Sequence, residues 1–352
     1  MIKSFKINNT KISLKNRPYI IAELSGNHKQ SLSRIFKLMH FAKDAGASAF
    51  KLQTLSADFI TVNCNRKEFL IKDSNNLWTG RTLHDVYKES ELPRKWHHKI
   101  FEKAKELNLD CFSSPFDLDS ISFLEEHDVP AYKIASFELT DELLVKEIAK
   151  TKKPIIASTG MASVKEIDRL VEILQKYGSG KFALLKCTSD YPANPEELNL
   201  KTISDLRQRY ECEVGFSDHS EGIGAACCAI AFGATIIEKH LTLNKKDGAL
   251  DSEFSSSPEE FKLLVNESIK AWQSIGKEKY GPTKSERKSL KYRRSLYAVK
   301  SIKKGELITG DNVRSVRPHF GLETKFFPIL VGKKAKMNIK KGTPISQNMV
   351  DV

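Results

Sequence analysis

The sequence has no apolar run that approaches the roughly 20 residues of a membrane span. Its first ten residues, MIKSFKINNT, lack the basic and then apolar layout of a signal peptide. Six cysteines occur, without CxxC spacing or a matching Cys/His pattern, which argues against a structural zinc site or a disulfide framework. We therefore expect a cytoplasmic protein with no membrane partner and with reduced thiols.

A concentrated basic region is also missing, although the net charge is +13. Lysine and arginine are spread along the chain, with local enrichment only near Lys284–Arg294 and in the C-terminal segment. This distribution favours a solvated surface and anionic small substrates over nucleic acid. Apolar residues make up 40% of the chain, enough for a globular core, and 352 residues allow one large domain and one small one.

What the sequence does contain is a repeated alternation of short β-rich runs and helical stretches. The runs number eight: Tyr19–Ser25, Ala49–Thr54, Asp110–Pro115, Ala131–Ser136, Pro154–Thr159, Lys181–Ser189, Glu213–Ser220 and Thr235–Thr242. Strand and helix in alternation predict a parallel sheet. Eight units in roughly 250 residues, with no GxGxxG or Walker loop, predict an α/β fold of the (β/α)8 TIM-barrel type rather than an open sheet.

The predicted barrel domain covers residues 1–275, with an N-terminal extension at 1–17 and a last helix at Pro258–Ile275. One connection, Leu55–Pro93, is far longer than the usual 2–6 residues. We interpret this excursion as an active-site lid, and a variable surface insertion is the alternative.

Residues 276–292 are polar and basic, contain Gly and Pro, and predict a linker. A small domain is expected at 293–352. Within it, Ile302-Lys-Lys-Gly305 followed by Ile308 and Val313 recurs as Ile339-Lys-Lys-Gly342 followed by Ile345 and Val350. This internal repeat predicts a strand–turn–strand element used twice. About sixty residues is small for an independent core, so we expect the module to pack on something larger.

Strand parity predicts which side chains face the barrel interior, because alternate residues of a strand point to opposite faces. On the second strand, Phe50 and Leu52 suit contact with the helices. Lys51 and Gln53 therefore face inward, near the carboxyl-end mouth where barrel enzymes have their active sites.

The same parity turns Ser217 and His219 inward on the seventh strand, and Glu238 and His240 on the eighth. Two imidazoles on adjacent strands suit a divalent metal such as Mn, Zn, Fe or Co with open positions for substrate. A pair of hydrogen-bonded histidines in a polar site is the alternative. Neighbouring carboxylates could orient the two rings: Asp218, Glu238 and Asp251.

Lys51 and Lys133 lie in otherwise apolar strands, where a lysine is costly without a partner, so each needs an anion. Hydroxyl side chains concentrate at the strand ends and would supply donors for a phosphate and a carboxylate: Ser113, Ser114, Ser136, Ser158, Thr159, Ser189 and Ser217. Any one of them alone is more often a turn or N-cap residue. Glu23 is an inward carboxylate that could serve as a base or as a salt-bridge partner of Lys51.

These segments resemble, in order, the sialic acid synthase (NeuB-like) family of phosphoenolpyruvate-dependent nonulosonic acid synthases: AELSGNH, KLQT, CFSSPFD, AYKIASFE, ASTGM, LKCTSDYP, GFSDHS and IEKH. The C-terminal RRSLYAVKSIKKGELITGDNVRSVRPHFGL resembles the antifreeze-protein-like (SAF) domain of that family. Further segments resemble its pseudaminic acid synthase branch: NNLWTGRTLHDVYKE, SSPFD, DSEFSSSPEEF and SVRPHFGL.

The resemblance implies site roles that are carried over by position. His219 and His240 would bind the metal, with Mn²⁺ first and Mg²⁺ or Co²⁺ as alternatives, and Glu23 would lie beside the reacting centre. The residues implied to hold phosphoenolpyruvate are Lys51, Ser114, Lys133, Ser136, Ser158, Ser189 and Ser217. Those implied to contact the sugar are Gln53, Tyr191, Asp251 and, from the RP motif of the SAF domain, Arg317.

In the family, the SAF domain of one subunit reaches over the barrel of its partner. The resemblance therefore implies a domain-swapped homodimer. Two departures from the family pattern occur in CTSDYP: Asp190 replaces a small hydroxyl residue, and Ser189 stands where neuraminate synthases tend to have asparagine.

The expected activity is the condensation of phosphoenolpyruvate with 2,4-diacetamido-2,4,6-trideoxy-β-L-altrose, which gives pseudaminic acid and phosphate. N-acetylneuraminate or legionaminic acid synthase is the alternative within the family. Outside it stand a metal-dependent barrel hydrolase of sugar phosphates and a non-catalytic carbohydrate-binding protein. Buried lysines and paired histidines argue against an inert scaffold.

Overall fold

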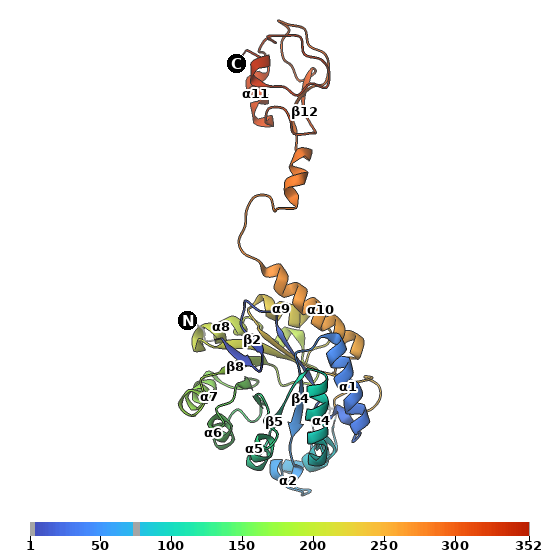
Figure 1. Cartoon of the computed structure of the whole chain (residues 1–352), viewed down its shortest axis with the longest axis vertical. Coiled ribbons are helices and arrows are strands. Elements are labelled where there is room, and N and C mark those ends of the chain that lie inside the picture. The colour runs from blue at the N-terminus through green and yellow to red at the C-terminus, as the bar shows by residue number, and fades with distance from the viewer. Residues whose placement is uncertain (1–3, 73–77, 352) are drawn as a thin grey trace. The chain divides into compact units, whose positions relative to one another are not determined.

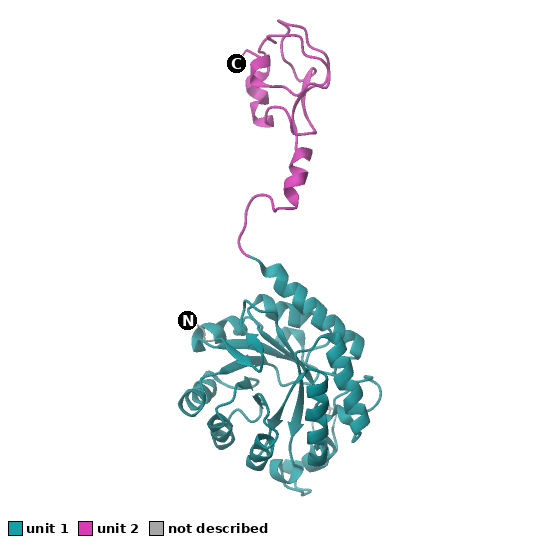
Figure 2. Ribbon diagram, viewed as in Figure 1, with its two compact units in different colours: residues 1–276 teal, residues 277–352 magenta. Residues whose placement is uncertain are grey.

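The chain forms two compact units, residues 1–276 and 277–352, which Figure 2 distinguishes by colour. The computed structural model describes residues 4–72 and 78–351. The first letters of the motif NNLWTGRTLHDVYKE, residues 75–77, therefore lie outside the described residues. Within the described ranges, no helix combines the length and the apolar character needed to cross a membrane.

The first unit is a closed barrel of eight parallel strands, as predicted (Figure 1). The strands are β3 (Tyr19–Glu23), β4 (Ala49–Thr54), β5 (Asp110–Pro115), β6 (Tyr132–Ile134), β7 (Ile155–Ser158), β8 (Phe182–Cys187), β9 (Glu213–Asp218) and β10 (Ile236–His240). Pairing of β10 with β3 closes the ring. The predictions of β4 and β5 match these bounds, and the other six run one or two residues too far at one or both ends. Several of these extra residues still make backbone hydrogen bonds to a neighbouring strand, as Leu24 N–H does to the Lys51 carbonyl and Thr159 N–H to the Leu185 carbonyl.

Helices follow the strands and surround the barrel: α1 (Leu32–Ala45), α4 (Arg94–Glu106), α5 (Leu118–Glu125), α6 (Glu142–Lys150), α7 (Val164–Tyr177), α8 (Thr202–Tyr210), α9 (Gly224–Ala231) and α10 (Pro258–Ile275). Short 3-10 turns also lie in this unit: η1 (Ser25–His28) and η3 (Pro195–Glu197). The helix α10 has the predicted bounds. Its N-terminus is a capping box in which Ser257 and Glu260 satisfy each other's backbone N–H groups.

The excursion at 55–93 carries secondary structure of its own: α2 (Ala57–Ile60), η2 (Lys67–Phe69) and α3 (Leu83–Ser90). Thr82 caps α3 by accepting a hydrogen bond from the Asp85 N–H. The described part of the excursion is thus folded.

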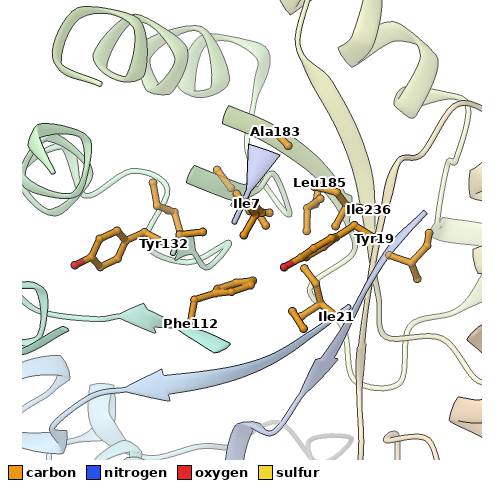
Figure 3. Close-up of a cluster of buried hydrophobic side chains, with 14 of the residues drawn as sticks. Ile7, Tyr19, Ile21, Phe112, Tyr132, Ala183, Leu185 and Ile236 are labelled. Atoms are coloured by element: carbon orange, nitrogen blue, oxygen red, sulfur yellow. The ribbon is translucent and has the colours of Figure 1, made fainter. Parts of the chain in front are cut away.

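An antiparallel hairpin of β1 (Phe5–Ile7) and β2 (Thr10–Ile12) buries Ile7 and Ile12 against the barrel core. Figure 3 shows Ile7 among the interior residues Ile21, Phe112 and Leu185. The next interior residue toward each carboxyl end is polar or a thiol, in the pairs Ile21/Glu23, Phe112/Ser114, Leu185/Cys187 and Ile236/Glu238. An apolar floor and a polar upper layer place the chemistry at the carboxyl-end mouth.

The second unit contains η4 (Glu286–Tyr292), β11 (Ser295–Ala298), β12 (Val313–Val316), η5 (Thr324–Phe326), α11 (Phe327–Leu330) and η6 (Gln347–Met349). It has a core of its own, a cluster of ten buried apolar residues: Leu296, Ala298, Ile302, Ile308, Val313, Leu330, Ala335, Ile339, Ile345 and Val350. The expectation that the module packs on something larger stays a prediction. The repeat itself supplies most of this cluster, because its isoleucines and valines from both copies meet there.

The two copies of the repeat contact each other through Ile302 and Ile339, which exchange two backbone hydrogen bonds of 2.8 Å. Gly305 and Gly342 follow at equivalent positions with φ of 82° and 87°, which favours glycine. The predicted strand–turn–strand element is only partly present: Val313 of the first copy pairs with Ala298 in the β11–β12 ladder, whereas Ile302, Ile339 and Val350 make isolated bridges.

Candidate active site

The mouth of the barrel encloses a pocket of about 510 Å³. Twelve of the fourteen predicted site residues line it: Glu23, Lys51, Gln53, Lys133, Ser136, Ser158, Ser189, Tyr191, Ser217, His219, His240 and Asp251. Ser114 is buried behind it and accepts a hydrogen bond of 3.2 Å from Lys51 Nζ. Arg317 belongs to the second unit, where it is exposed.

Each buried lysine has the anionic partner that its position requires. Lys51 Nζ lies 2.5 Å from Glu23 Oε2 and 3.9 Å from Glu238 Oε1. Lys133 Nζ lies 3.7 Å from the same Glu238 oxygen. Two lysines and two glutamates thus balance one another, and the salt-bridge interpretation of Glu23 describes its geometry here.

Burial and these partners shift the pKa values in different directions. Burial raises the pKa of Glu23, and Lys51 offsets only part of the rise. Burial alone would lower the pKa of Lys51, but Glu23 and Glu238 outweigh it and the pKa is raised. Burial lowers the pKa of Lys133, since Glu238 compensates incompletely. Lys51 is therefore the more firmly charged of the two lysines.

Hydroxyl groups surround the lysines at the strand ends. Lys133 Nζ donates to Ser158 Oγ at 2.7 Å, and the Oγ atoms of Ser136 and Ser189 lie 2.8 Å apart. Ser217 donates to Glu238 Oε1 at 3.3 Å. Ammonium and hydroxyl donors arranged in this way suit an oxyanion such as phosphate or carboxylate.

The two inward histidines meet with ring centroids 5.3 Å apart. His219 Nδ1 lies 2.9 Å from the Thr188 carbonyl oxygen, which favours a proton on Nδ1 and a lone pair on Nε2. His240 Nδ1 is buried with no hydrogen-bond partner, and Asp251 Oδ2 is 4.0 Å away. This donor set fits a divalent metal that is held by two imidazoles and completed by substrate or water.

The described residues contain no group of three His, Cys, Asp or Glu side chains with a metal-binding arrangement, so the protein itself would supply few ligands. The expectation that Asp218 orients the histidines is wrong. Asp218 forms a buried ion pair of 2.8 Å with Lys239, because both residues have the outward parity of their strands. Glu238 contacts the lysines instead.

One acidic residue of the pocket was missed by sequence reasoning. Glu138 follows β6 and lines the pocket, and its Oε2 is buried without a hydrogen-bond partner. Burial raises its pKa to about 7. Only its place in the segment AYKIASFE could have indicated it, because a lone carboxylate after a strand has no spacing signal. Asp190 is exposed at the edge of the pocket, and it accepts a hydrogen bond from the Tyr191 N–H.

The excursion contributes Leu55, Ile71, Trp78, Leu83, Val86 and Tyr87 to the pocket. Trp78 Nε1 donates at 3.3 Å to the carbonyl of Leu250, in the loop between β10 and α10. The described part of the excursion therefore belongs to the site. This favours the interpretation of the excursion as an active-site lid and not as a variable surface insertion.

Comparison with known proteins gives matches over nearly the whole chain. The sequence model of the NeuB family matches residues 38–280, and that of the SAF domain matches residues 293–351. A pseudaminic acid synthase of Campylobacter jejuni subsp. jejuni serotype O:2 is 45% identical over 94% of this chain and 95% of that protein. The pseudaminic acid synthase of Helicobacter pylori is 36% identical over 95% of this chain and 98% of that protein.

Among solved structures, an N-acetylneuraminic acid (sialic acid) synthetase from Leptospira borgpetersenii serovar Hardjo-bovis, in complex with citrate, has a TM-score of 0.72. It is 32% identical in sequence, and the match covers 82% of this chain and 96% of that one.

Proposed function

The chain belongs to the NeuB family, and on that premise we propose that it is a transferase that condenses phosphoenolpyruvate with 2,4-diacetamido-2,4,6-trideoxy-β-L-altrose and water. The products are pseudaminic acid and phosphate. The observation that carries the proposal is the 45% identity to a pseudaminic acid synthase over 94% of the chain, together with a pocket of buried lysines and serines suited to an anionic substrate.

Phosphoenolpyruvate would bind at the polar upper layer of the barrel. Lys133 and Ser158 offer an ammonium and a hydroxyl donor already held at hydrogen-bond distance of each other, and Lys51 adds a second ammonium that Ser114 positions from behind the pocket. Ser136, Ser189 and Ser217 extend this donor set around the mouth. Rigid placement of this kind can contribute roughly 7–11 kcal/mol to catalysis by holding two reactants together.

His219 and His240 would hold a divalent metal, Mn²⁺ first. When bound, such an ion acts as a Lewis acid on a carbonyl oxygen, here the aldehyde oxygen of the open-chain sugar. The unpartnered Nδ1 of His240 and the fixed Nδ1 contact of His219 support this assignment, because both leave ring nitrogens available as ligands.

In the reaction, C3 of phosphoenolpyruvate forms a bond to C1 of the sugar as the aldehyde C=O π bond breaks. The aldehyde oxygen takes up that electron pair and a proton to become a hydroxyl, and positive charge develops at C2. Water then adds to C2, and the C–O bond to phosphate breaks. Glu23 would take the proton of that water, and its raised pKa brings it closer to working pH. Lys51 and Lys133 would stabilise the departing phosphate oxygens.

Gln53, Tyr191 and Asp251 would contact the sugar from the barrel, and Arg317 from the SAF domain of a second copy. The exposed apolar side chains Phe59, Phe137 and Met161 follow β4, β6 and β7 at the carboxyl-end mouth, which supports a partner over this face. We therefore propose a domain-swapped homodimer.

Six free cysteines agree with a cytoplasmic setting.

A synthase for N-acetylneuraminate or legionaminic acid is the second candidate, and the likeness to the Leptospira synthetase favours it. The sequence identity to the Leptospira synthetase is 32%, however, and the identity to the Campylobacter pseudaminic acid synthase is 45%. A barrel hydrolase would need more metal ligands than the described residues offer. A mere binding protein would gain nothing from two buried lysines.

The test is incubation with phosphoenolpyruvate and a panel of open-chain acetamido hexoses. Release of inorganic phosphate is followed, and the product is identified by mass spectrometry and NMR. We expect a nine-carbon keto acid from the 2,4-diacetamido-6-deoxy altrose. A product only from N-acetylmannosamine or the legionaminic precursor would select the second candidate, and no phosphate release from any sugar would refute a synthase.

A further inference from the structure

The pocket has two chemically different kinds of lining. The strand ends contribute charged and hydroxyl groups, whereas the excursion contributes mostly apolar side chains. We call the latter the apolar wall, defined as Leu55, Ile71, Trp78, Leu83 and Val86. Phosphoenolpyruvate carries a phosphate and a carboxylate, and these charged groups gain nothing from contact with apolar side chains. The apolar wall must therefore contact the second substrate or exclude water.

Several bonds fix the apolar wall relative to the barrel. Trp78 Nε1 donates at 3.3 Å to the Leu250 carbonyl. His28 Nε2 lies 3.1 Å from the Ser90 carbonyl at the end of α3, and Gln30 Nε2 donates at 2.7 Å to the carbonyl of Glu91. The excursion is thus bonded both to the loop after β3 and to the loop after β10.

Leu250 itself is placed by close packing with Gly26 in the loop after β3. A Cβ atom on residue 26 would lie 2.8 Å from Leu250 Cβ, so only glycine fits. The backbone N–H of the same Gly26 donates at 2.9 Å to Asp251 Oδ2. The loop whose Leu250 carbonyl accepts the Trp78 hydrogen bond therefore also contains Asp251, one of the residues expected to contact the sugar.

We propose that the apolar wall contacts the deoxygenated end of the sugar and thereby sets a preference for a 6-deoxy hexose over its 6-hydroxy counterpart. A methyl group at C6 gains apolar contact with such a wall. A hydroxyl against these five side chains would lose its hydrogen bonds to water and gain none from them. The excursion also brings Tyr87 and Ser90 to the pocket, but the Ser90 hydroxyl already donates to the Tyr87 carbonyl at 2.9 Å. This inference rests on the proposed function, because it concerns the sugar of that same reaction.

Discrimination against an added hydroxyl in an apolar site reaches about 10- to 100-fold in kcat/KM. We expect the wild-type protein to prefer the 6-deoxy sugar by that factor when two sugars that differ only at C6 are compared. The side chains of the apolar wall, and not those at the strand ends, would determine this ratio of kcat/KM values.

Two substitutions test the wall. Leu83→Asn keeps the side-chain size at the first position of α3 but offers an amide, and Val86→Thr replaces a methyl group by a hydroxyl. Each is expected to lower the ratio of kcat/KM between the 6-deoxy and 6-hydroxy sugars by about tenfold. Val62→Asn is the matched control, because Val62 lies in the same excursion, is exposed, and does not line the pocket.

A ratio that stays at the wild-type value in a folded and active Leu83→Asn or Val86→Thr protein would overturn the inference. An equal fall in the Val62→Asn control would do the same. The proposed function fails separately, when the wild-type protein forms no keto acid from either sugar. Melting temperatures of all variants identify any that do not fold, and the remaining wall variant then decides.

Discussion

Four buried charges, those of Glu23, Lys51, Lys133 and Glu238, neutralise one another in the pocket. Removing one partner of a buried pair typically costs about 3–5 kcal/mol, because the other charge is left uncompensated. Alanine at any of these positions would therefore disturb both folding and chemistry. Substitutions at the rim of this group are the better probes of function.

At His219 the metal proposal is open to direct measurement. The His219→Ala protein should lose bound Mn²⁺, and phosphate release should fall to background, because one of two imidazole ligands is gone. Elemental mass spectrometry measures the metal independently of activity. The exposed His98 offers a matched control, and His98→Ala should keep the metal. Wild-type activity should stop with a chelator and return with Mn²⁺, and full activity in chelator would contradict the proposal.

Glu138 predicts a pH-dependent stability. Because its pKa rises from 4.5 to about 7 on folding, the folded state binds the proton more tightly than the unfolded state. The resulting penalty is complete above pH 7, shrinks as the pH falls through the folded pKa, and is absent below about pH 4.5. Glu138→Gln should therefore raise the free energy of unfolding at pH 8 by about 3 kcal/mol and much less at pH 5.

Urea unfolding of wild type and Glu138→Gln at the two pH values measures this difference. The exposed Glu126, on the preceding helix–strand connection, provides the control substitution Glu126→Gln. An advantage of Glu138→Gln that is the same at pH 5 and pH 8 would show that the carboxyl is not protonated more readily in the folded protein.

At the scale of single elements, the loop after β7 shows how closely the mouth is packed. A Cβ on residue 160 would lie 2.2 Å from Ser189 Oγ and 3.1 Å from Ser136 Cβ. Gly160 therefore permits the contact between these two serines, which follow the different strands β6 and β8. The backbone φ of Gly160 does not require glycine. Glycine is needed at this position only because there is no space for a Cβ atom.

Gly160→Ala should displace the Ser189 hydroxyl and raise the KM for phosphoenolpyruvate by about tenfold, the equivalent of one lost hydrogen bond. The KM for the sugar should change less. Steady-state kinetics with each substrate varied in turn gives both values. Gly224→Ala is the control, since a Cβ there meets nothing within 4 Å. A larger effect on the sugar than on phosphoenolpyruvate would contradict the anion assignment of Ser136 and Ser189.

Strand parity predicted the inward side chains of the elements correctly, as at Lys51, His219 and His240. It depends only on the twofold period of a strand, which the sequence carries. Strand ends were less well predicted. The residues beyond Glu23 and Cys187 still look extended in sequence, but their hydrogen-bond partners depend on the stagger of neighbouring strands.

At the scale of the whole molecule, the proposed swapped dimer predicts that Arg317 of one chain serves the barrel of its partner. Arg317 makes no hydrogen bond or ion pair with the residues described in the structure, and it is exposed. A guanidinium with its donors free suits a contact to a ligand or to another chain.

Mixing two defective variants tests this contact. In a swapped dimer of Arg317→Ala with His219→Ala, the first chain provides an intact barrel and the second an intact Arg317. Refolding or co-expressing the two variants in equal amounts should restore about a quarter of the wild-type activity, since half of the dimers are mixed and each has one complete site. Phosphate release at low sugar concentration measures it.

A mixture of His219→Ala with His240→Ala serves as the control and should stay inactive, because each barrel then lacks a metal ligand. Absence of recovery in the first mixture, with dimers present by analytical ultracentrifugation, would place Arg317 in the same chain as the barrel it serves or remove it from the site.

The sequence by itself determined the eight strand–helix units, the repeat in the second unit and the inward parity of the pocket residues. Periods of 2.0 and 3.6 residues are local properties, and a residue's neighbours in sequence are enough to define them. The same local order carried the family motifs.

Only the tertiary structure decided which charges pair and what closes the pocket. The partners of Lys51 come from β3 and β10, and those of Trp78 from the loop after β10, so these contacts join segments far apart in the chain. Glu138 became visible for the same reason. Its raised pKa results from burial by side chains of other elements, and no spacing in the sequence records that burial.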